Sequence, residues 1–211
     1  MPDPDLKIVG FDPGTAVTGW ATLLGPRHPR LLQAGAIRAK ANQPIEKRLL
    51  AIYRGVMDVL DEYDPHVVAI EDPFVGKNPS GALTLGQARG VILLAVAQRE
   101  CEVVNYTPAT IKASVVGKGS AEKEQVREMV MRLLGLKKVP EPLDASDAIA
   151  VALCHINRGM NAAYTAGRAG AKPSDGVKSA ASGTQTRAQK LAARKEDADA
   201  LARWLSGGRN K

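Results

Sequence analysis

The stretch KIVGFDPGTAVTGWATL, residues 7–23, places a carboxylate where an apolar segment ends. The apolar residues on either side of Asp12 predict two short strands, and Pro13 and Gly14 between them are typical of a turn. A carboxylate at the end of a buried strand costs desolvation energy unless another group pairs with it. Asp12 is therefore either a cap that accepts backbone hydrogen bonds in the turn or part of a charged site built with other segments.

Three more carboxylates stand at the borders of apolar segments. Glu71 follows four apolar residues in VVAIEDPF, at the end of another expected buried strand. Asp144 and Asp147 in LDASDAIAVALCH are three residues apart, so they share one face of an expected helix, and that face is otherwise apolar. Acids at a helix start often serve only as caps or partners of the helix dipole. Four such acids, however, are hard to explain as independent caps.

If these four carboxylates converge, their mutual repulsion must be offset by cations. Oxygen ligands without His or Cys favour Mg²⁺ or Mn²⁺. A pair of such ions about 4 Å apart activates water and stabilises the leaving oxygen in phosphodiester cleavage. The acidic set therefore predicts a two-metal hydrolytic site.

Working outward from residues 7–23, hydrophobic periodicity predicts further strands and five helices. Strands are expected at 30–39, 66–71 and 101–107, and helices at 44–63, 78–100, 107–116, 120–135 and 144–157. Ser120 is the expected start of the fourth helix. Three strands in a meander followed by alternating strands and helices predict an α/β fold with a mixed five-stranded sheet flanked by helices.

The 211 residues predict one folded domain, 1–158, and a basic tail, 159–211. Residues 1–157 contain 18 Lys and Arg against 18 Asp and Glu, whereas residues 158–211 contain 11 against 4. The whole net charge of +7 is thus a property of the tail. Its Ala, Gly, Ser, Thr and Lys content offers little apolar surface to bury, so we expect disorder from about residue 160.

No segment is expected to reach the roughly 18 apolar residues that span a bilayer, and the N-terminus lacks the pattern of a signal peptide. We therefore expect a cytoplasmic protein without a membrane segment. Cys101 and Cys154 stand singly in apolar surroundings, so we interpret them as small buried residues rather than as metal ligands.

Several motifs together resemble one enzyme family. They are GFDPGTAVTGW, AIEDPFVGKN, ALTLGQARGV, VVGKGSAEKEQV and LDASDAIAVALCH, which follow one another in the order and spacing of that family. The chain, from about residue 6 to about residue 157, resembles the RuvC-type Holliday junction resolvases, which have a ribonuclease H-like fold. The tail beyond residue 160 is longer than is usual in that family.

The resemblance implies a structure-specific endonuclease of recombination and DNA repair. It places the catalytic acids at Asp12, Glu71, Asp144 and Asp147, the four selected above. Asp12 would bridge two metal ions while Glu71 holds one ion and the helix acids Asp144 and Asp147 hold the other. An activated water would attack the phosphorus and leave a 5′-phosphate and a 3′-hydroxyl. The family also implies a homodimer, four-way junction DNA as substrate and a branch-migration helicase complex as partner.

Candidate DNA contacts lie in two segments. Basic residues surround the glycine-bearing turn of VVGKGSAEK, where a helix start also offers free backbone N–H groups to a phosphate; they are Lys112, Lys118 and Lys123. Phe74 lies in a loop past Glu71, where it could stack on an unpaired base or fold onto the core. Lys77 and Asn78 in the same loop are weaker candidates for backbone contacts.

Glycines at 81, 86 and 90 interrupt an otherwise good helix, so something must approach it closely: a neighbouring helix of the fold or a second subunit. Two rival functions remain at this point. DPGTAVTG also fits the phosphate loop of an actin-like ATPase, although this chain has no room for the second domain such a protein needs. A non-catalytic DNA-binding protein would use the basic tail but leave the four acids unexplained.

Overall fold

The computed structural model describes residues 5–72 and 79–169, which lie in one compact unit, Met1–Gly170. Its centre is a five-stranded sheet with the strand order β3-β2-β1-β4-β5. The strands are β1 (Lys7–Asp12), β2 (Val17–Leu24), β3 (Arg30–Arg38), β4 (Val67–Glu71) and β5 (Glu102–Tyr106). β1, β2 and β3 form an antiparallel meander, whereas β4 and β5 run parallel to β1. The predicted mixed five-stranded sheet is confirmed.

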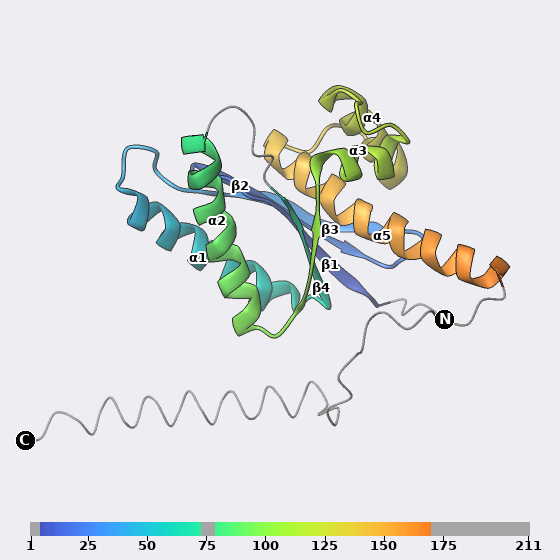
Figure 1. Ribbon diagram of the computed structural model, residues 1–211, viewed down its shortest axis with the longest axis horizontal. Helices are drawn as coiled ribbons and strands as arrows, with labels where there is room; N and C mark the ends of the chain where they lie inside the picture. Colours follow the sequence, from blue (N-terminus) through green and yellow to red (C-terminus); the bar gives the residue numbers. More distant parts are fainter. Residues whose placement is uncertain (1–4, 73–78, 170–211) are drawn as a thin grey trace, which may run out of the picture. The chain divides into compact units, whose positions relative to one another are not determined.

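Helices cover both faces of this sheet (Figure 1). α1 (Ile45–Tyr63) and α2 (Pro79–Gln98) lie on one face, and they connect β3 to β4 and β4 to β5. α3 (Pro108–Val116), α4 (Lys123–Leu134) and α5 (Leu143–Ala169) lie on the other side of the sheet. Short turns join the antiparallel strands of the meander, whereas the parallel strands β4 and β5 need the longer crossovers that contain α1 and α2.

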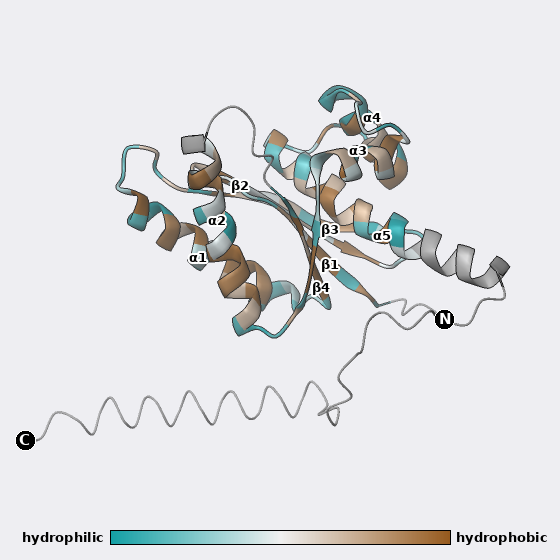
Figure 2. Cartoon of the chain, viewed as in Figure 1, coloured by the Kyte–Doolittle hydropathy of each residue, from teal (hydrophilic) through white to brown (hydrophobic). Residues whose placement is uncertain are grey.

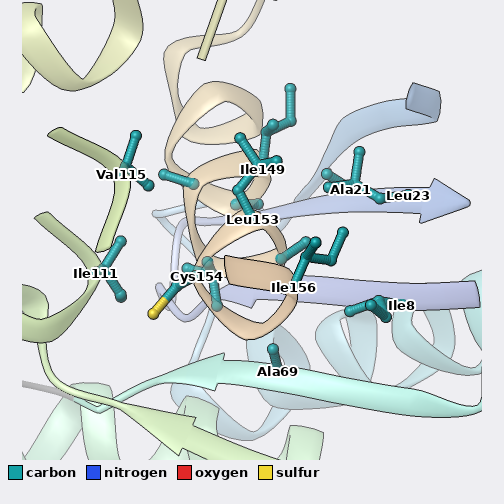
Figure 3. Close-up of a cluster of buried hydrophobic side chains, with 14 of the residues drawn as sticks. Ile8, Ala21, Leu23, Ala69, Ile111, Val115, Ile149, Leu153, Cys154 and Ile156 are labelled. Atoms are coloured by element: carbon teal, nitrogen blue, oxygen red, sulfur yellow. The ribbon is translucent and has the colours of Figure 1, made fainter. Parts of the chain in front are cut away.

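Two hydrophobic clusters hold the layers together. The first joins α1 and α2 to the sheet through fully buried residues such as Val9, Phe11 and Ile92. The second is built around α5, whose Ile149 and Leu153 pack between the sheet and α3, as Figure 3 shows. Because α5 packs against the sheet on one side and against α3 on the other, the position of its first turns relative to β1 and β2 is fixed.

Two helix boundaries differ from the predicted ones, whereas α3 begins close to its predicted start. Thr107 is the N-cap of α3, and its Oγ1 accepts the Thr110 backbone N–H at 3.2 Å. The predicted start of α4 at Ser120 is wrong, because the Gln125 side chain accepts the Glu122 backbone N–H at 2.9 Å and thereby makes Glu122 the N-cap. Ser120 lies in the preceding turn.

α5 also continues past the expected end at Asn157, to Ala169. The helix extends because residues 158–169 contain four Ala residues and no Pro, and Gly159 lowers helix propensity without ending the helix. The expected beginning of disorder at about residue 160 is therefore too early for residues 160–169. Residues 170–211 lie outside the described part of the chain.

The expectation that no segment reaches membrane-spanning length is not met by α2. Its segment Gly81–Gln98 is long and apolar enough to cross a bilayer by length and composition alone, and Figure 2 shows hydrophobic stretches along this helix. One such helix is weak evidence for a membrane segment, because packed helices pass the same test. Ala88, Ile92, Ala95 and Val96 of α2 are fully buried in the first cluster.

Candidate functional site

The parallel pairing of β1 with β4 brings Asp12 and Glu71 to the same edge of the sheet. Phe11 and Ile70 are register partners, and the two carboxylates follow directly at the ends of their strands. Alternate residues of a strand point to one face. Asp12 therefore shares the face of Ile8, and Glu71 shares the face of Ala69, both of which pack in the cluster around α5.

The turn that follows Asp12 is held by hydrogen bonds from two directions. The buried Thr18 hydroxyl donates to the Gly14 carbonyl at 2.7 Å. From α1, the Arg48 Nε donates to the Thr15 carbonyl at 2.9 Å, and its guanidinium also donates to the Thr15 hydroxyl. Through these bonds, polar groups of Gly14 and Thr15 have partners other than the Asp12 carboxylate.

Two glycines let α5 approach the strands closely enough to deliver its acids. Gly19 is the register partner of Asp12 on β2, and a Cβ at Gly19 would fall on the backbone carbonyl of Asp144. A Cβ at Gly10 would likewise fall on the backbone of Ala148. The first turn of α5 thus lies directly against the sheet beside Asp12, because neither glycine has a side chain to hold it away.

The carboxylates near this edge of the sheet repel one another. Burial, then Glu71, Asp147 and Asp144, raise the pKa of Asp12 to about 7, while Lys123 acts in the opposite direction. Burial, then Asp147, raise the pKa of Glu71 to about 7, against the effects of Lys123 and Lys112. The two strand acids are therefore costly to ionise without a further cation.

Two basic residues of α4 lie beside the Asp147 carboxylate. Lys123 Nζ donates to Asp147 Oδ2 at 3.1 Å, and the Arg127 guanidinium lies 3.9 Å from Asp147 Oδ1. The hydrogen bond to Asp147 and the nearby Asp12 and Glu71 charges raise the pKa of Lys123, against the effect of its partial burial. Lys123 is thus a cation shared among three acids.

The other predicted site residues differ in where they lie. Lys112 on α3 is near enough to Glu71 to lower its pKa. Lys118 instead lines a surface cavity of about 300 Å³ beside Gln125 and Met129. Phe74, Lys77 and Asn78 lie outside the described residues. Within residues 5–72 and 79–169, no three Asp, Glu, His or Cys side chains are close enough together to hold a metal ion as they stand.

Sequence reasoning missed the residues that position the acids. Arg48 of α1 holds the turn after Asp12, and Gly10 and Gly19 allow α5 to approach the sheet. Each of these contacts joins elements that are distant in the sequence, so no local pattern indicates them. Arg127 had a local signal, since it lies four residues after Lys123 and therefore on the same face of α4. That spacing becomes informative only once α4 is known to pack beside Asp147.

The family model described as crossover junction endodeoxyribonuclease RuvC matches residues 8–155. The chain belongs to this family. The RuvC crossover junction endodeoxyribonuclease of Chloroflexus aurantiacus is 44% identical to it over 162 residues, which cover 76% of this chain and 94% of the relative.

Two solved structures of Thermus thermophilus RuvC are also similar. One is 31% identical with a TM-score of 0.69, covering 74% of this chain and 97% of the other. The second, RuvC in complex with Holliday junction substrate, is 29% identical with a TM-score of 0.67, covering 74% and 96%. The sheet and helices described above are thus the ribonuclease H-like fold of the RuvC family, whose members are metal-dependent nucleases.

Proposed function

We propose that this chain resolves Holliday junctions by metal-dependent hydrolysis of two symmetrically placed phosphodiesters, with Asp12, Glu71, Asp144 and Asp147 as the acidic site. The observation that carries this proposal is the coupling of Asp12 to the three other acids at one edge of a RuvC fold. A cap for a turn would not need three neighbouring carboxylates. Neither an actin-like ATPase nor a non-catalytic DNA-binding protein would explain why Asp12 interacts with three other carboxylates.

The donor set suits hard divalent cations, and we propose two Mg²⁺ ions per site, with Mn²⁺ as the alternative. Asp12 and Glu71 have pKa values of about 7, so a bound cation would offset the repulsion that now raises them. The acids do not yet converge as a ligand set. The four carboxylates would hold such ions, and Lys123, which pairs with Asp147, would compete with them for that carboxylate.

The chemistry that such ions supply is activation of a water and stabilisation of the leaving oxygen. In this chain, Asp12 would act as the central ligand, because it couples to the acids of both β4 and α5. Glu71 would hold one side of the site, and Asp144 and Asp147 the other. Lys123, once released from Asp147, would lie free to bind a DNA phosphate.

Replacement of Asp12 tests this assignment. Asp12→Asn should lower cleavage of a four-way junction at least about 1000-fold, since the transition-state stabilisation from metal ions amounts to several kcal/mol. Junction binding in EDTA should persist or tighten, because the change also removes a charge that repels phosphate. Asp58→Asn, at an exposed position on α1, is the matched control and should cleave normally. Near-normal cleavage by Asp12→Asn would refute the site.

DNA contacts are proposed for the basic residues that flank this site. Lys112 and Lys123 lie close to the acids, so they would bind phosphates next to the bond that is cut. Lys118 would contact a phosphate further along the duplex arm. Phe74, Lys77 and Asn78 remain proposals from the sequence, with Phe74 stacking on an unpaired base at the junction.

We propose a homodimer formed through one exposed face of α2. Leu83, Gly86, Gly90 and Leu94 follow one another at helical spacing, and the two leucines are 69% and 55% exposed. A Cβ at Gly86 or Gly90 would meet no atom within 4 Å among the described residues. Within the described fold no element packs closely on these glycines, so this face is open to close approach by the same face of a second copy.

Charge placed on this face should separate the subunits. Leu94→Glu should halve the mass measured by sedimentation at micromolar concentration, because it buries a charge in the interface. Leu133→Glu, at an exposed leucine on α4, should leave the mass unchanged. A wild-type chain that sediments as a monomer, alone and on junction DNA, or a Leu94→Glu variant that remains dimeric, would contradict this interface.

The cellular setting follows from the same family resemblance. We propose that the enzyme acts in the cytoplasm during recombination and DNA repair, together with a branch-migration helicase complex. Pull-down of such a helicase with the dimer, but not with heat-denatured protein, would support that partner.

A further inference from the structure

Asp147 on α5 lies between two cations of α4. Lys123 Nζ is 3.1 Å from one carboxylate oxygen, and the Arg127 guanidinium is 3.9 Å from the other. The two basic residues are four positions apart, so they lie on the same face of α4. α4 therefore presents two positive charges to one acid of the proposed site.

The two cations differ in their access to solvent and to DNA. The Lys123 side chain is 64% exposed, whereas that of Arg127 is 15% exposed and that of Asp147 is 18% exposed. A flexible, exposed ammonium can leave an ion pair at little cost and follow a phosphate. The enclosed guanidinium of Arg127 has far less access to solvent, and so to a phosphate, than the Lys123 ammonium has.

Arg127 also has unused hydrogen-bonding capacity. A guanidinium has five N–H donors, and the partners recorded for Arg127 are Glu124 at 3.4 Å and Asp147 at 3.9 Å. Its Nε is buried without a hydrogen-bond partner among the described residues. The distance to Asp147 exceeds that of a hydrogen bond while Lys123 occupies the other oxygen. Arg127 can therefore strengthen its pairing if Lys123 departs.

We propose that Arg127 is a positioning residue that holds the Asp147 carboxylate in place when Lys123 is drawn from it to a DNA phosphate. This inference rests on the proposed nuclease site. Lys123 then moves between Asp147 and the DNA substrate, whereas Arg127 keeps the Asp147 carboxylate oriented toward Asp12. Without Arg127, Asp147 would lose its remaining cation at the moment when the site must be assembled.

The test compares three full-length variants with wild type. Arg127→Met removes the charge but keeps much of the side-chain volume, and Arg127→Lys keeps the charge without the planar fork. Arg132→Met removes a charge from an exposed position of the same helix and is the matched control. Measurements are single-turnover cleavage at saturating enzyme, junction affinity in EDTA, Mn²⁺ binding by electron paramagnetic resonance, and melting temperature.

Arg127→Met should slow cleavage about 10-fold to 100-fold and weaken Mn²⁺ binding, as is usual when a group that orients a metal ligand is removed. Junction affinity and melting temperature should stay close to those of Arg132→Met, and Arg127→Lys should recover part of the rate. The Mn²⁺ result is decisive, because loss of a merely repelling cation would tighten metal binding instead.

Unchanged or tighter Mn²⁺ binding in Arg127→Met, or a rate equal to that of Arg132→Met, would overturn the inference. A rate loss that merely parallels a fall in melting temperature would assign Arg127 a packing role and overturn it too. If Arg127→Met does not fold, Arg127→Lys decides, since it must then show slower cleavage and weaker Mn²⁺ binding at normal stability. Failure of wild type to cleave with any divalent ion would refute the proposed function itself.

Discussion

At the scale of single residues, the proposed site is a place where function opposes stability. Asp12 and Glu71 have pKa values of about 7, far above those of ordinary carboxyl groups, because burial and neighbouring acids disfavour their ionised forms. In the unfolded chain both would ionise near their usual values. Between those values and about pH 7 the folded state binds more protons than the unfolded state, so stability falls as pH rises through this range.

This linkage predicts that removing a catalytic charge stabilises the metal-free enzyme. In EDTA at pH 8, Asp12→Asn should melt several degrees above wild type, at about 2–4 °C per kcal/mol for a chain of this size. The difference should shrink on acidification and vanish near pH 3, below the usual pKa of 3.8, where Asp12 is protonated in both states. Calorimetry over pH 3–8 provides the measurement. A constant difference across that range would contradict the raised pKa.

The same residues show what the sequence could and could not predict. All four acids were selected because each borders an apolar segment, which is a local signal. Arg48 and Gly19 had none, because their importance comes from contacts between elements separated by long stretches of chain. The start of α4 was misplaced for a smaller reason: Ser120 and Glu122 both fit a helix start, and the reciprocal bonding of Gln125 favours the second.

At the scale of elements, the site depends on how closely α5 approaches the sheet. The acids of α5 lie in its first turns, and the backbone of those turns touches Gly19 and Gly10. The rest of α5 is held by the hydrophobic cluster with α3 and the sheet. Any atom added at the contact must therefore move the acids or distort the strands.

Gly19→Ala should accordingly damage both stability and catalysis. The added Cβ would overlap the Asp144 carbonyl, and overpacking of this kind costs about 1–3 kcal/mol. A shift of about 1 Å in a catalytic group can lower the rate about 100-fold. Gly159→Ala adds a methyl group to α5 where a Cβ meets no atom within 4 Å, so it should be neutral or stabilising. Equal melting temperatures and rates for the two variants would contradict the close-contact argument.

At the scale of the whole molecule, charge and chemistry are placed in different parts of the chain. Residues 1–157 are neutral overall and contain the four acids, whereas residues 158–211 contain all of the net +7 charge. Because α5 continues to Ala169, a deletion that respects the fold begins at residue 170. That segment holds nine Lys and Arg against four Asp and Glu, so most of the excess charge would be removed.

Deleting residues 170–211 should weaken DNA binding without changing how the junction is cut. Each phosphate that a basic residue neutralises adds about 0.9 to the slope of log affinity against log salt concentration. The slope should therefore flatten for junction and linear duplex alike, while the nick position and the rate at saturating enzyme stay constant, because Lys112, Lys123 and the four acids remain. Fluorescence anisotropy across a salt series measures the slope. An unchanged slope would show that the segment does not contribute phosphate contacts, and a shift from dimer to monomer would assign it to the subunit interface instead.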